Sequence, residues 1–276
     1  MTRTDATASR WSASDVEQVD CCICAVPGAP LYAGPRLDPF AVVRCPRCAL
    51  VFVSPRLRPA ALQQVYDDTG YFDDGVYGAE DSMAMRLQRT WTAGRLGMLG
   101  AELGRGPGGA AVLEVGCGYG LFLAAARDAG YTTTGVELSA PAAAHARDRL
   151  GLTMHEGQLE DAPLPAGGYD AVLAWDTIEH VPDPVAFLRT VRGLLAPDGV
   201  LLFSTPYFSS WPARLLRTRW WTLKPAEHIW HFTPRTHEIA LARAGMRLVR
   251  TVRSPLARGN LARLDSLVGV ARPGPG

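Results

Sequence analysis

Six cysteines occur in the chain, and four of them form two pairs near the N-terminus. Cys21 and Cys24 make the first pair, and Cys45 and Cys48 make the second, so the spacing is C-x2-C-x20-C-x2-C. A C-x2-C turn lets two thiolates face one ion, and two such turns complete the tetrahedral shell that Zn2+ prefers. The spacing predicts a closed, structural zinc site. Cys22 is an alternative ligand in the first pair, and a redox pair or four unrelated buried thiols are the other interpretations.

A glycine-rich turn lies near the middle of the chain, in the sequence LEVGCGYG at 113–120. Gly116, Gly118 and Gly120 stand between an apolar, strand-like run and a helix-like segment, where backbone N–H groups can approach a ligand closely. Glu137 follows the next predicted strand, and a carboxylate there can accept both hydroxyls of a ribose. The spacing is GxGxG and not the GxGxxG of pyrophosphate binders. The pattern predicts an adenosine-containing cofactor, and a simple tight turn is the alternative.

The segments around this turn alternate between strand-like and helix-like patterns. Apolar runs predict strands at 110–115, 132–136, 152–155, 170–174, 199–204, 247–252 and 266–271. Helical spacing predicts helices at 82–103, 121–129, 141–150, 184–195 and 235–244. This alternation with short loops implies right-handed crossovers. It predicts an α/β fold with a mostly parallel sheet and helices on both faces.

Several of these stretches together resemble class I S-adenosylmethionine-dependent methyltransferases: LEVGCGYG, VEL at 136–138, YDAVLAWDTIEHVPDP at 169–184 and LLAPDGVLLFSTP at 194–206. Within that group the chain is most similar to ubiquinone-type and natural-product methyltransferases that carry a Glu-His-Val motif. The cysteine pairs, RCPRCALVFVSPR and EHIWHFTPRT resemble a subgroup with an N-terminal zinc-binding module. The resemblance covers residues 84–271. It implies a Rossmann-like, seven-stranded sheet preceded by a small zinc-ribbon-like module.

The resemblance implies that eleven residues contact S-adenosylmethionine: Glu114, Gly116, Cys117, Gly118, Gly120, Glu137, Leu138, Gln158, Leu159, Trp175 and Asp176. The first five would surround the methionine part, and Glu137 would hold the ribose hydroxyls. The next three would line the adenine, although Gln158 replaces the commoner Asp and leaves an adenine N6 contact in doubt. The last two would line the sulfonium end.

His180 is the candidate general base. The sulfonium methyl is already electrophilic, so the site must mainly align a nucleophile and exclude water. A hydroxyl nucleophile benefits from a base, and an ordinary imidazole with a pKa near 6.5 can accept a proton at cellular pH. The alternative is that His180 only shapes its loop through a hydrogen bond. No further metal-binding pattern is evident outside the cysteines, so metal-independent chemistry is expected.

An insertion at 207–233, after the fifth strand of the sheet, is rich in tryptophan and arginine. Such side chains suit an aromatic or anionic substrate, so Trp221, His228 and His231 are candidate substrate contacts. A lid or binding element is one interpretation of the insertion. The other is an amphipathic helix whose tryptophans pack on the body of the protein.

The domain organisation expected is a disordered N-terminus at 1–18, the zinc-ribbon-like module at 19–60, a linker or lid at 61–83, the methyltransferase domain at 84–271 and a tail at 272–276. With 47% hydrophobic residues, disorder of the whole chain is excluded. No stretch is apolar enough to span a membrane, and Met1–Asp20 contains no secretory signal, so a cytoplasmic location is expected.

Charges nearly cancel over the whole chain but not along it. The formal net charge is +1, whereas the part from Arg214 onward holds twelve basic and three acidic residues. This asymmetry indicates either an anionic substrate or simply an arginine-rich surface.

The function that fits best is methylation of a small molecule, on oxygen, in secondary or cofactor metabolism. The expected partner is a small, aromatic or anionic substrate; no membrane or nucleic-acid partner is expected, and the oligomeric state stays open. The alternatives are a methyltransferase acting on RNA or protein, and a non-catalytic zinc-ribbon adaptor with a degenerate nucleotide fold. A nicotinamide-dependent oxidoreductase is disfavoured by the GxGxG spacing.

Overall fold

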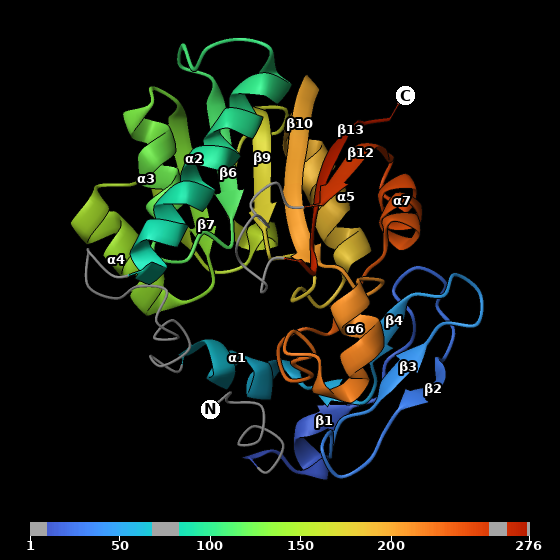
Figure 1. The fold of residues 1–276 in the computed structure, drawn as a ribbon. Helices are drawn as coiled ribbons and strands as arrows, with labels where there is room; N and C mark the ends of the chain where they lie inside the picture. The colour runs from blue at the N-terminus through green and yellow to red at the C-terminus, as the bar shows by residue number, and fades with distance from the viewer. Residues whose placement is uncertain (1–9, 68–82, 254–263, 275–276) are drawn as a thin grey trace.

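A seven-stranded sheet forms the centre of the computed structural model, which describes residues 10–67, 83–253 and 264–274 (Figure 1). Its strands are β6 (Ala111–Val115), β7 (Thr132–Glu137), β8 (Met154–Glu156), β9 (Tyr169–Trp175), β10 (Leu195–Pro206), β12 (Met246–Arg253) and β13 (Ser266–Pro273). Their order is β12-β13-β10-β9-β6-β7-β8. Strand β13 runs antiparallel to both of its neighbours, and the five strands from β10 to β8 are parallel. The predicted mostly parallel, seven-stranded sheet is confirmed.

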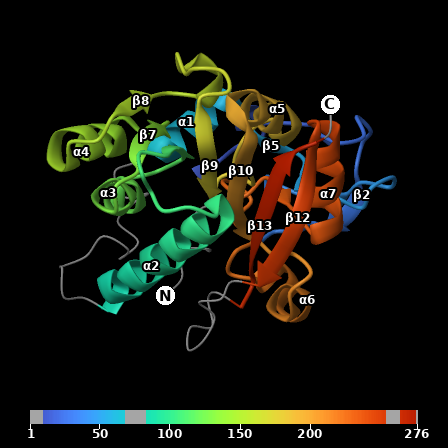
Figure 2. The same ribbon diagram turned by 90° about the horizontal axis from the view of Figure 1, so that it is seen from above.

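Helices cover both faces of this sheet (Figure 2). They are α2 (Met83–Leu103), α3 (Leu121–Asp128), α4 (Ala140–Leu150), α5 (Pro184–Leu194) and α7 (Pro234–Arg243). Helices α2 and α3 lie on one face, and α5 and α7 lie on the other. The central strands are apolar at nearly every position because both of their faces are buried, as in parallel sheets generally.

The loop between β9 and α5 is held by a capped helix start. The side chain of Asp183 accepts hydrogen bonds from the backbone N–H groups of Val185 and Ala186, at 2.9 and 3.0 Å. Pro184 follows at the first helical position, where its fixed φ suits a helix and no N–H is needed. The cap therefore fixes where the loop after β9 ends and α5 begins.

A small antiparallel sheet lies beside the carboxyl ends of the parallel strands (Figure 1). It contains β2 (Ala29–Tyr32), β3 (Val42–Arg44), β4 (Val51–Val53) and β11 (Trp230–His231), in the order β11-β4-β3-β2. Strand β11 belongs to the insertion, which also holds α6 (Trp211–Leu216) and a short 3-10 helix at Arg217–Arg219. The module expected at 19–60 therefore takes one of its strands from a segment far along the chain.

Three expected boundaries differ from the structure. Disorder over 1–18 is wrong for residues 10–18, because a 3-10 helix (Ala13–Asp15) leads into β1 (Val16–Glu17), which pairs with β5 (Arg56–Leu57). The expected linker begins as α1 (Pro59–Asp67), since Pro59 starts a helix that buries Ala61 and Leu62. The tail begins as strand, because Arg272 and Pro273 pair with β12. Residues 1–9, 68–82 and 275–276 lie outside the described residues.

The small sheet and the large sheet share one hydrophobic core. Val43 and Phe52 of the small sheet belong to the same buried cluster as Leu113 and Phe203 of the large one. Leu50, directly before β4, is also in this cluster. This shared cluster of buried side chains fastens the small sheet against the end of the large sheet. Among the described residues, no helix combines the length and apolarity that crossing a membrane requires.

Candidate functional site

The glycine turn between β6 and α3 needs glycine for two reasons. Gly116, Gly118 and Gly120 have φ values of 71°, 54° and 77°, in the left-handed region that other residues rarely adopt. A Cβ on Gly116 would lie 2.7 Å from the Thr177 hydroxyl oxygen, and one on Gly120 would lie 2.6 Å from Leu152 Cδ1. The turn therefore needs glycine at these positions, at the carboxyl end of β6, and carries no side chain there.

Glu137 is held at the end of β7 by backbone donors. One carboxylate oxygen accepts from the Gly118 N–H at 2.7 Å, and the other accepts from the Ser139 N–H at 2.8 Å. Burial raises the pKa of Glu137, and these backbone hydrogen bonds oppose that shift. Each carboxylate oxygen has a further lone pair, so both can still accept a hydroxyl of a ribose.

Glu114 lies beneath the turn as a buried, incompletely paired carboxyl. Its side chain is 4% exposed, and Oε2 has no hydrogen-bond partner among the described residues. Burial raises its pKa to about 8; Arg95 lowers the pKa and Glu137 raises it further. A buried acceptor without a donor fits an ammonium group beside the turn. The residues present therefore fit the α-amino group and the ribose of S-adenosylmethionine.

Arg95, which the sequence analysis did not single out, lies against two of the candidate site residues. It projects from α2, with its guanidinium carbon 4.6 Å from the ring centroid of Trp175 and a nitrogen 3.3 Å from an Asp176 oxygen. The Ser204 hydroxyl donates to the other Asp176 oxygen at 2.9 Å. No motif surrounds Arg95, and only the packing of α2 across β9 brings it to the two residues expected at the sulfonium end.

The remaining residues expected at the cofactor line the same edge of the sheet with different exposure. Cys117 is buried with its sulfur 4.0 Å from that of Met154, and burial keeps its pKa well above the ordinary value. Leu138 is half-buried, Leu159 is buried and Gln158 is exposed. Cys117 is therefore a neutral thiol that packs behind the turn.

Glu179, His180 and His228 form a cluster beyond the end of β9. Each can offer one ligand atom, and these atoms lie within 4.8 Å of one another. The rings of the two histidines meet edge to face, with centroids 4.7 Å apart. Glu179 is fully buried, and neither carboxylate oxygen has a hydrogen-bond partner among the described residues. One carboxylate and two imidazoles form a donor set able to hold a divalent cation such as Zn2+ or Fe2+. Metal-independent chemistry was expected because no metal-binding pattern was evident outside the cysteines. That reason is wrong, because His228, from the insertion, joins Glu179 and His180 as a third donor.

The protonation of this cluster follows from its burial. Burial lowers the pKa of His180 to about 4, Lys224 lowers it further, and Asp176 opposes the shift. Burial likewise keeps the pKa of His228 well below its ordinary value and raises that of Glu179. His228 Nδ1 lies 2.8 Å from the Thr222 carbonyl oxygen and must donate to it, so Nε2 carries the free lone pair. Both imidazoles are therefore neutral acceptors at neutral pH.

The other two candidate substrate residues lie outside this cluster. His231 is 1% exposed, with its ring centroid 5.6 Å from that of Phe208 and 6.0 Å from that of Trp220. Burial lowers the pKa of His231 to about 3, so it is a neutral ring within the packing. Trp221 is half-buried and packs on the cluster around Trp220. Of the three candidate substrate residues in the insertion, only His228 lies beside His180.

Cys21, Cys24, Cys45 and Cys48 converge as the spacing predicted. Their sulfurs lie within 4.8 Å of one another, and those of Cys21 and Cys48 are 3.6 Å apart. Sulfurs bound 2.3 Å from a tetrahedral zinc ion lie roughly 3.8 Å apart, so the four thiols fit that ion. Cys22 is not part of this group.

The small sheet is joined by hydrogen bonds to the loop that carries Glu179 and His180. The Ile229 and Trp230 N–H groups donate to the Glu179 carbonyl oxygen at 3.0 and 3.2 Å. Trp230 Nε1 donates to the carbonyl of Val181 at 2.8 Å. Arg56, from β5, donates to the carbonyl of Pro182, also at 2.8 Å. The cysteine-rich part of the protein therefore braces the loop at the end of β9.

The candidate site lies within a part of the chain that matches a known protein family. A family described as "Methyltransferase domain" matches residues 83–251, more than half of the chain. The chain belongs to this family of class I S-adenosylmethionine-dependent methyltransferases. The match begins with α2 and ends in β12, so it includes the glycine turn, Glu137 and the Glu179–His180 loop.

Similar methyltransferases occur among curated and solved proteins. A ubiquinone biosynthesis O-methyltransferase of Actinobacillus pleuropneumoniae is 33% identical over 141 residues, which are 47% of this chain and 58% of that protein. The chain thus spans little more than half the length of that relative. The 1,6-didemethyltoxoflavin-N1-methyltransferase of Burkholderia thailandensis, solved with S-adenosylhomocysteine, has a TM-score of 0.59 at 23% identity and covers 90% of this chain and 100% of its own. Magnesium protoporphyrin IX methyltransferase of Synechocystis has a TM-score of 0.60 at 17% identity and covers 79% and 100%. These two structures confirm the fold.

Proposed function

We propose that this protein transfers a methyl group from S-adenosylmethionine to an oxygen atom of a small molecule in secondary or cofactor metabolism. The observation that carries the proposal is the arrangement at the ends of β6 and β7. A bare glycine turn lies above Glu114, which has an unpaired buried oxygen, and beside Glu137, which is fixed by two backbone donors. Family membership and the O-methyltransferase relative support the same reaction.

The cofactor supplies the electrophilic methyl group. This chain's residues would therefore bind the cofactor, orient the substrate and accept a proton. Glu137 would hold the ribose hydroxyls and Glu114 the α-amino group. His180 and His228 are neutral acceptors beyond β9, where one of them would take the hydroxyl proton as the new C–O bond forms. Because the pKa of His180 is about 4, it would accept the proton late, after the forming C–O bond has placed positive charge on the hydroxyl oxygen and made its proton acidic.

We further propose that the four clustered cysteines hold a structural zinc ion. Four thiolates fill the tetrahedral shell, so no open position remains for a substrate. The zinc would act through the fold: it would hold the small sheet, which in turn is hydrogen-bonded to the Glu179–His180 loop. Zinc quantification on the purified protein tests this, and one zinc per chain is expected.

Calorimetric titration with S-adenosylhomocysteine tests the cofactor site. The wild type should bind, and Glu137→Ala should weaken binding by at least about tenfold, because charge-assisted hydrogen bonds contribute roughly 1.5–3 kcal/mol. Glu160→Gln, at an exposed position, is the matched control and should bind like the wild type. Equal affinity of Glu137→Ala and the wild type would refute the ribose assignment. Transfer of labelled methyl groups to RNA or protein, with none to small phenols, would favour the macromolecular alternative.

A further inference from the structure

Asp265 is a buried side chain directly before β13. It is 2% exposed, and its Oδ2 accepts hydrogen bonds from Trp220 Nε1 at 2.6 Å and from the Thr222 hydroxyl at 2.7 Å. Its backbone carbonyl accepts from the Tyr207 N–H. These donors all belong to the insertion, whereas β13 pairs with β10 in the large sheet. Asp265 therefore ties the insertion to the large sheet from a buried position, where a polar group needs such partners.

Thr222 connects this anchor to His228. The backbone carbonyl oxygen of Thr222 accepts from His228 Nδ1 at 2.8 Å and from the Lys224 N–H at 3.0 Å. The His228 N–H donates in turn to the Lys224 carbonyl at 2.7 Å. Hydrogen bonds therefore hold both the ring and the backbone of His228 within the turn at 222–228. A shift of Thr222 would move the acceptor that the His228 ring uses.

The Thr222 carbonyl decides which nitrogen of His228 carries the proton. Burial keeps the pKa of His228 well below its ordinary value, so the ring is neutral and has a single N–H. A neutral imidazole donates through one nitrogen and accepts through the other, and its hydrogen-bond partner sets which is which. The bond to Thr222 places the proton on Nδ1. The Nε2 lone pair is therefore what His228 offers beside Glu179 and His180.

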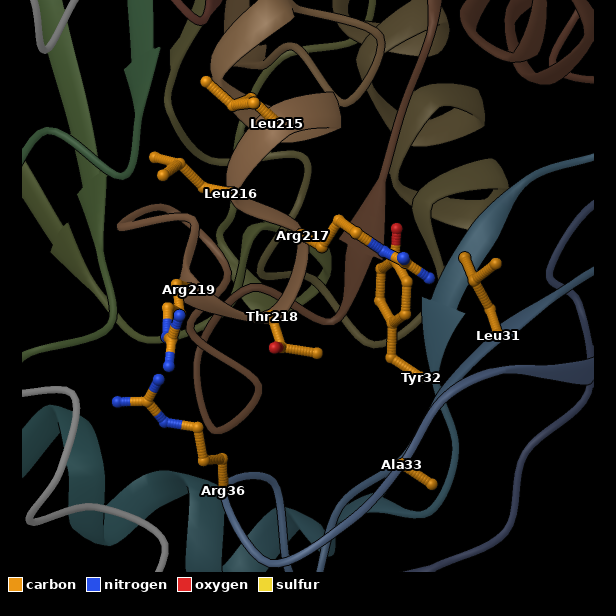
Figure 3. A pocket seen from close by; sticks show the side chains of 9 residues that line it. All are labelled: Leu31, Tyr32, Ala33, Arg36, Leu215, Leu216, Arg217, Thr218 and Arg219. Atoms are coloured by element: carbon orange, nitrogen blue, oxygen red, sulfur yellow. The ribbon is translucent and has the colours of Figure 1, made fainter.

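The chain that leads into this anchor borders a hollow. Residues 215–219 line one side of a hollow of about 540 Å³, and the end of β2 with the turn after it lines the other (Figure 3). Arg217 reaches the far side, where its guanidinium carbon lies 5.5 Å from the ring centroid of Tyr32. Side chains that border a hollow lack packing partners on that side. The hydrogen bonds of Asp265 to Trp220 and Thr222 therefore restrain the segment that follows.

We propose that Asp265 is a positioning residue: through Thr222 it holds His228 in the Nδ1–H tautomer, with Nε2 free to accept a proton. Its part in the reaction rests on the methyl transfer proposed above. The hydroxyl proton would pass to Nε2 as the new C–O bond forms and the S–C bond of the cofactor breaks. The products are a methyl ether, S-adenosylhomocysteine and a protonated imidazole. In the other tautomer Nε2 already carries a proton and cannot accept one.

Long-range proton–nitrogen NMR spectra of the isotope-labelled full chain test the proposal, because they distinguish the two tautomers of each histidine. His228→Gln identifies the His228 signals. The wild type should show the Nδ1–H tautomer at neutral pH. Thr222→Val removes the hydroxyl bond to Asp265 and leaves the bond from Trp220 intact, and it should shift His228 toward the Nε2–H tautomer. Thr222→Ser keeps the hydroxyl and should give the wild-type spectrum.

Thr218→Val is the matched control, since it makes the same substitution in the insertion at a residue that lines the hollow (Figure 3). It should leave the His228 tautomer unchanged. An Nε2–H tautomer in the wild type, a wild-type spectrum in Thr222→Val, or equal shifts in the two valine variants would overturn the proposal. Titration of the same samples with S-adenosylhomocysteine separates this result from the proposed function. All variants should bind it like the wild type, and absence of binding to the wild type would count against the cofactor site and not against the tautomer.

Discussion

Replacing Glu114 with glutamine should change how the stability of the protein depends on pH. The folded protein holds this carboxyl in a buried place, which raises its pKa from an ordinary 4.5 to about 8. Between these two values the folded form keeps a proton that the unfolded form has released. Stability contributed by the protonated carboxyl is therefore complete below pH 4.5 and is lost as the pH rises through 8.

The size of the effect follows from that shift. At about 1.4 kcal/mol per pKa unit, a rise from 4.5 to about 8 corresponds to roughly 5 kcal/mol at most. About 4 kcal/mol of this falls between about pH 5 and pH 9. Glutamine has nearly the shape of the protonated carboxyl and does not ionise. The Glu114→Gln variant should therefore match the wild type at about pH 5 and exceed its unfolding free energy by up to about 4 kcal/mol at about pH 9.

Urea unfolding of both proteins across this pH range measures the difference directly. The difference between variant and wild type cancels most titrations that the two share. Glu160→Gln, at an exposed position, is the control for replacing a glutamate with glutamine at the surface. A difference between Glu114→Gln and the wild type that stays constant from about pH 5 to pH 9 would refute the raised pKa and the reasoning built on it.

Three further outcomes are expected. Cys45→Ser should release zinc and lower kcat while S-adenosylhomocysteine affinity stays unchanged. The reason is that the small sheet braces the Glu179–His180 loop and not the glycine turn. Full kcat in a zinc-free variant would contradict the bracing. Trp230→Phe keeps a ring against Phe52 but loses the 2.8 Å bond to Val181, so urea unfolding should show a loss of about 1 kcal/mol, and an unchanged midpoint would argue against that bond. The acid limb of kcat/KM should lie near pH 4, because burial lowers the pKa of His180 to about 4; a limb near 6.5 would mean that another group accepts the proton.

Features that depend on neighbouring residues could be predicted from the sequence. The cysteine spacing names all four thiols, because a C-x2-C turn brings its own two sulfurs together whatever surrounds it. The glycine turn and the parallel strands are likewise visible, since continuous apolar runs and three closely spaced glycines are local signals. The helices and strands of the large sheet accordingly lie where the pattern predicts them.

Contacts between distant segments could not be predicted in this way. Strand β11 joins the small sheet although 178 positions separate Trp230 from its pairing partner Phe52. A two-residue strand has no sequence pattern of its own and forms only where the edge of a sheet is open to it. Arg95 meets Trp175 through the packing of a helix whose sequence carries no motif.

The chemistry of the site divides in the same way. The amino-acid sequence by itself predicted the candidate residues: the four thiols, Glu137 and the histidine of the Glu179–His180 pair. Only the tertiary structure decided that His228 joins that pair and that Glu114 and His180 are buried. The physical reason is that the covalent structure of a side chain fixes which atoms it can offer to a ligand. Its pKa and its proximity to other groups arise instead from burial and from neighbours that the folded chain brings together.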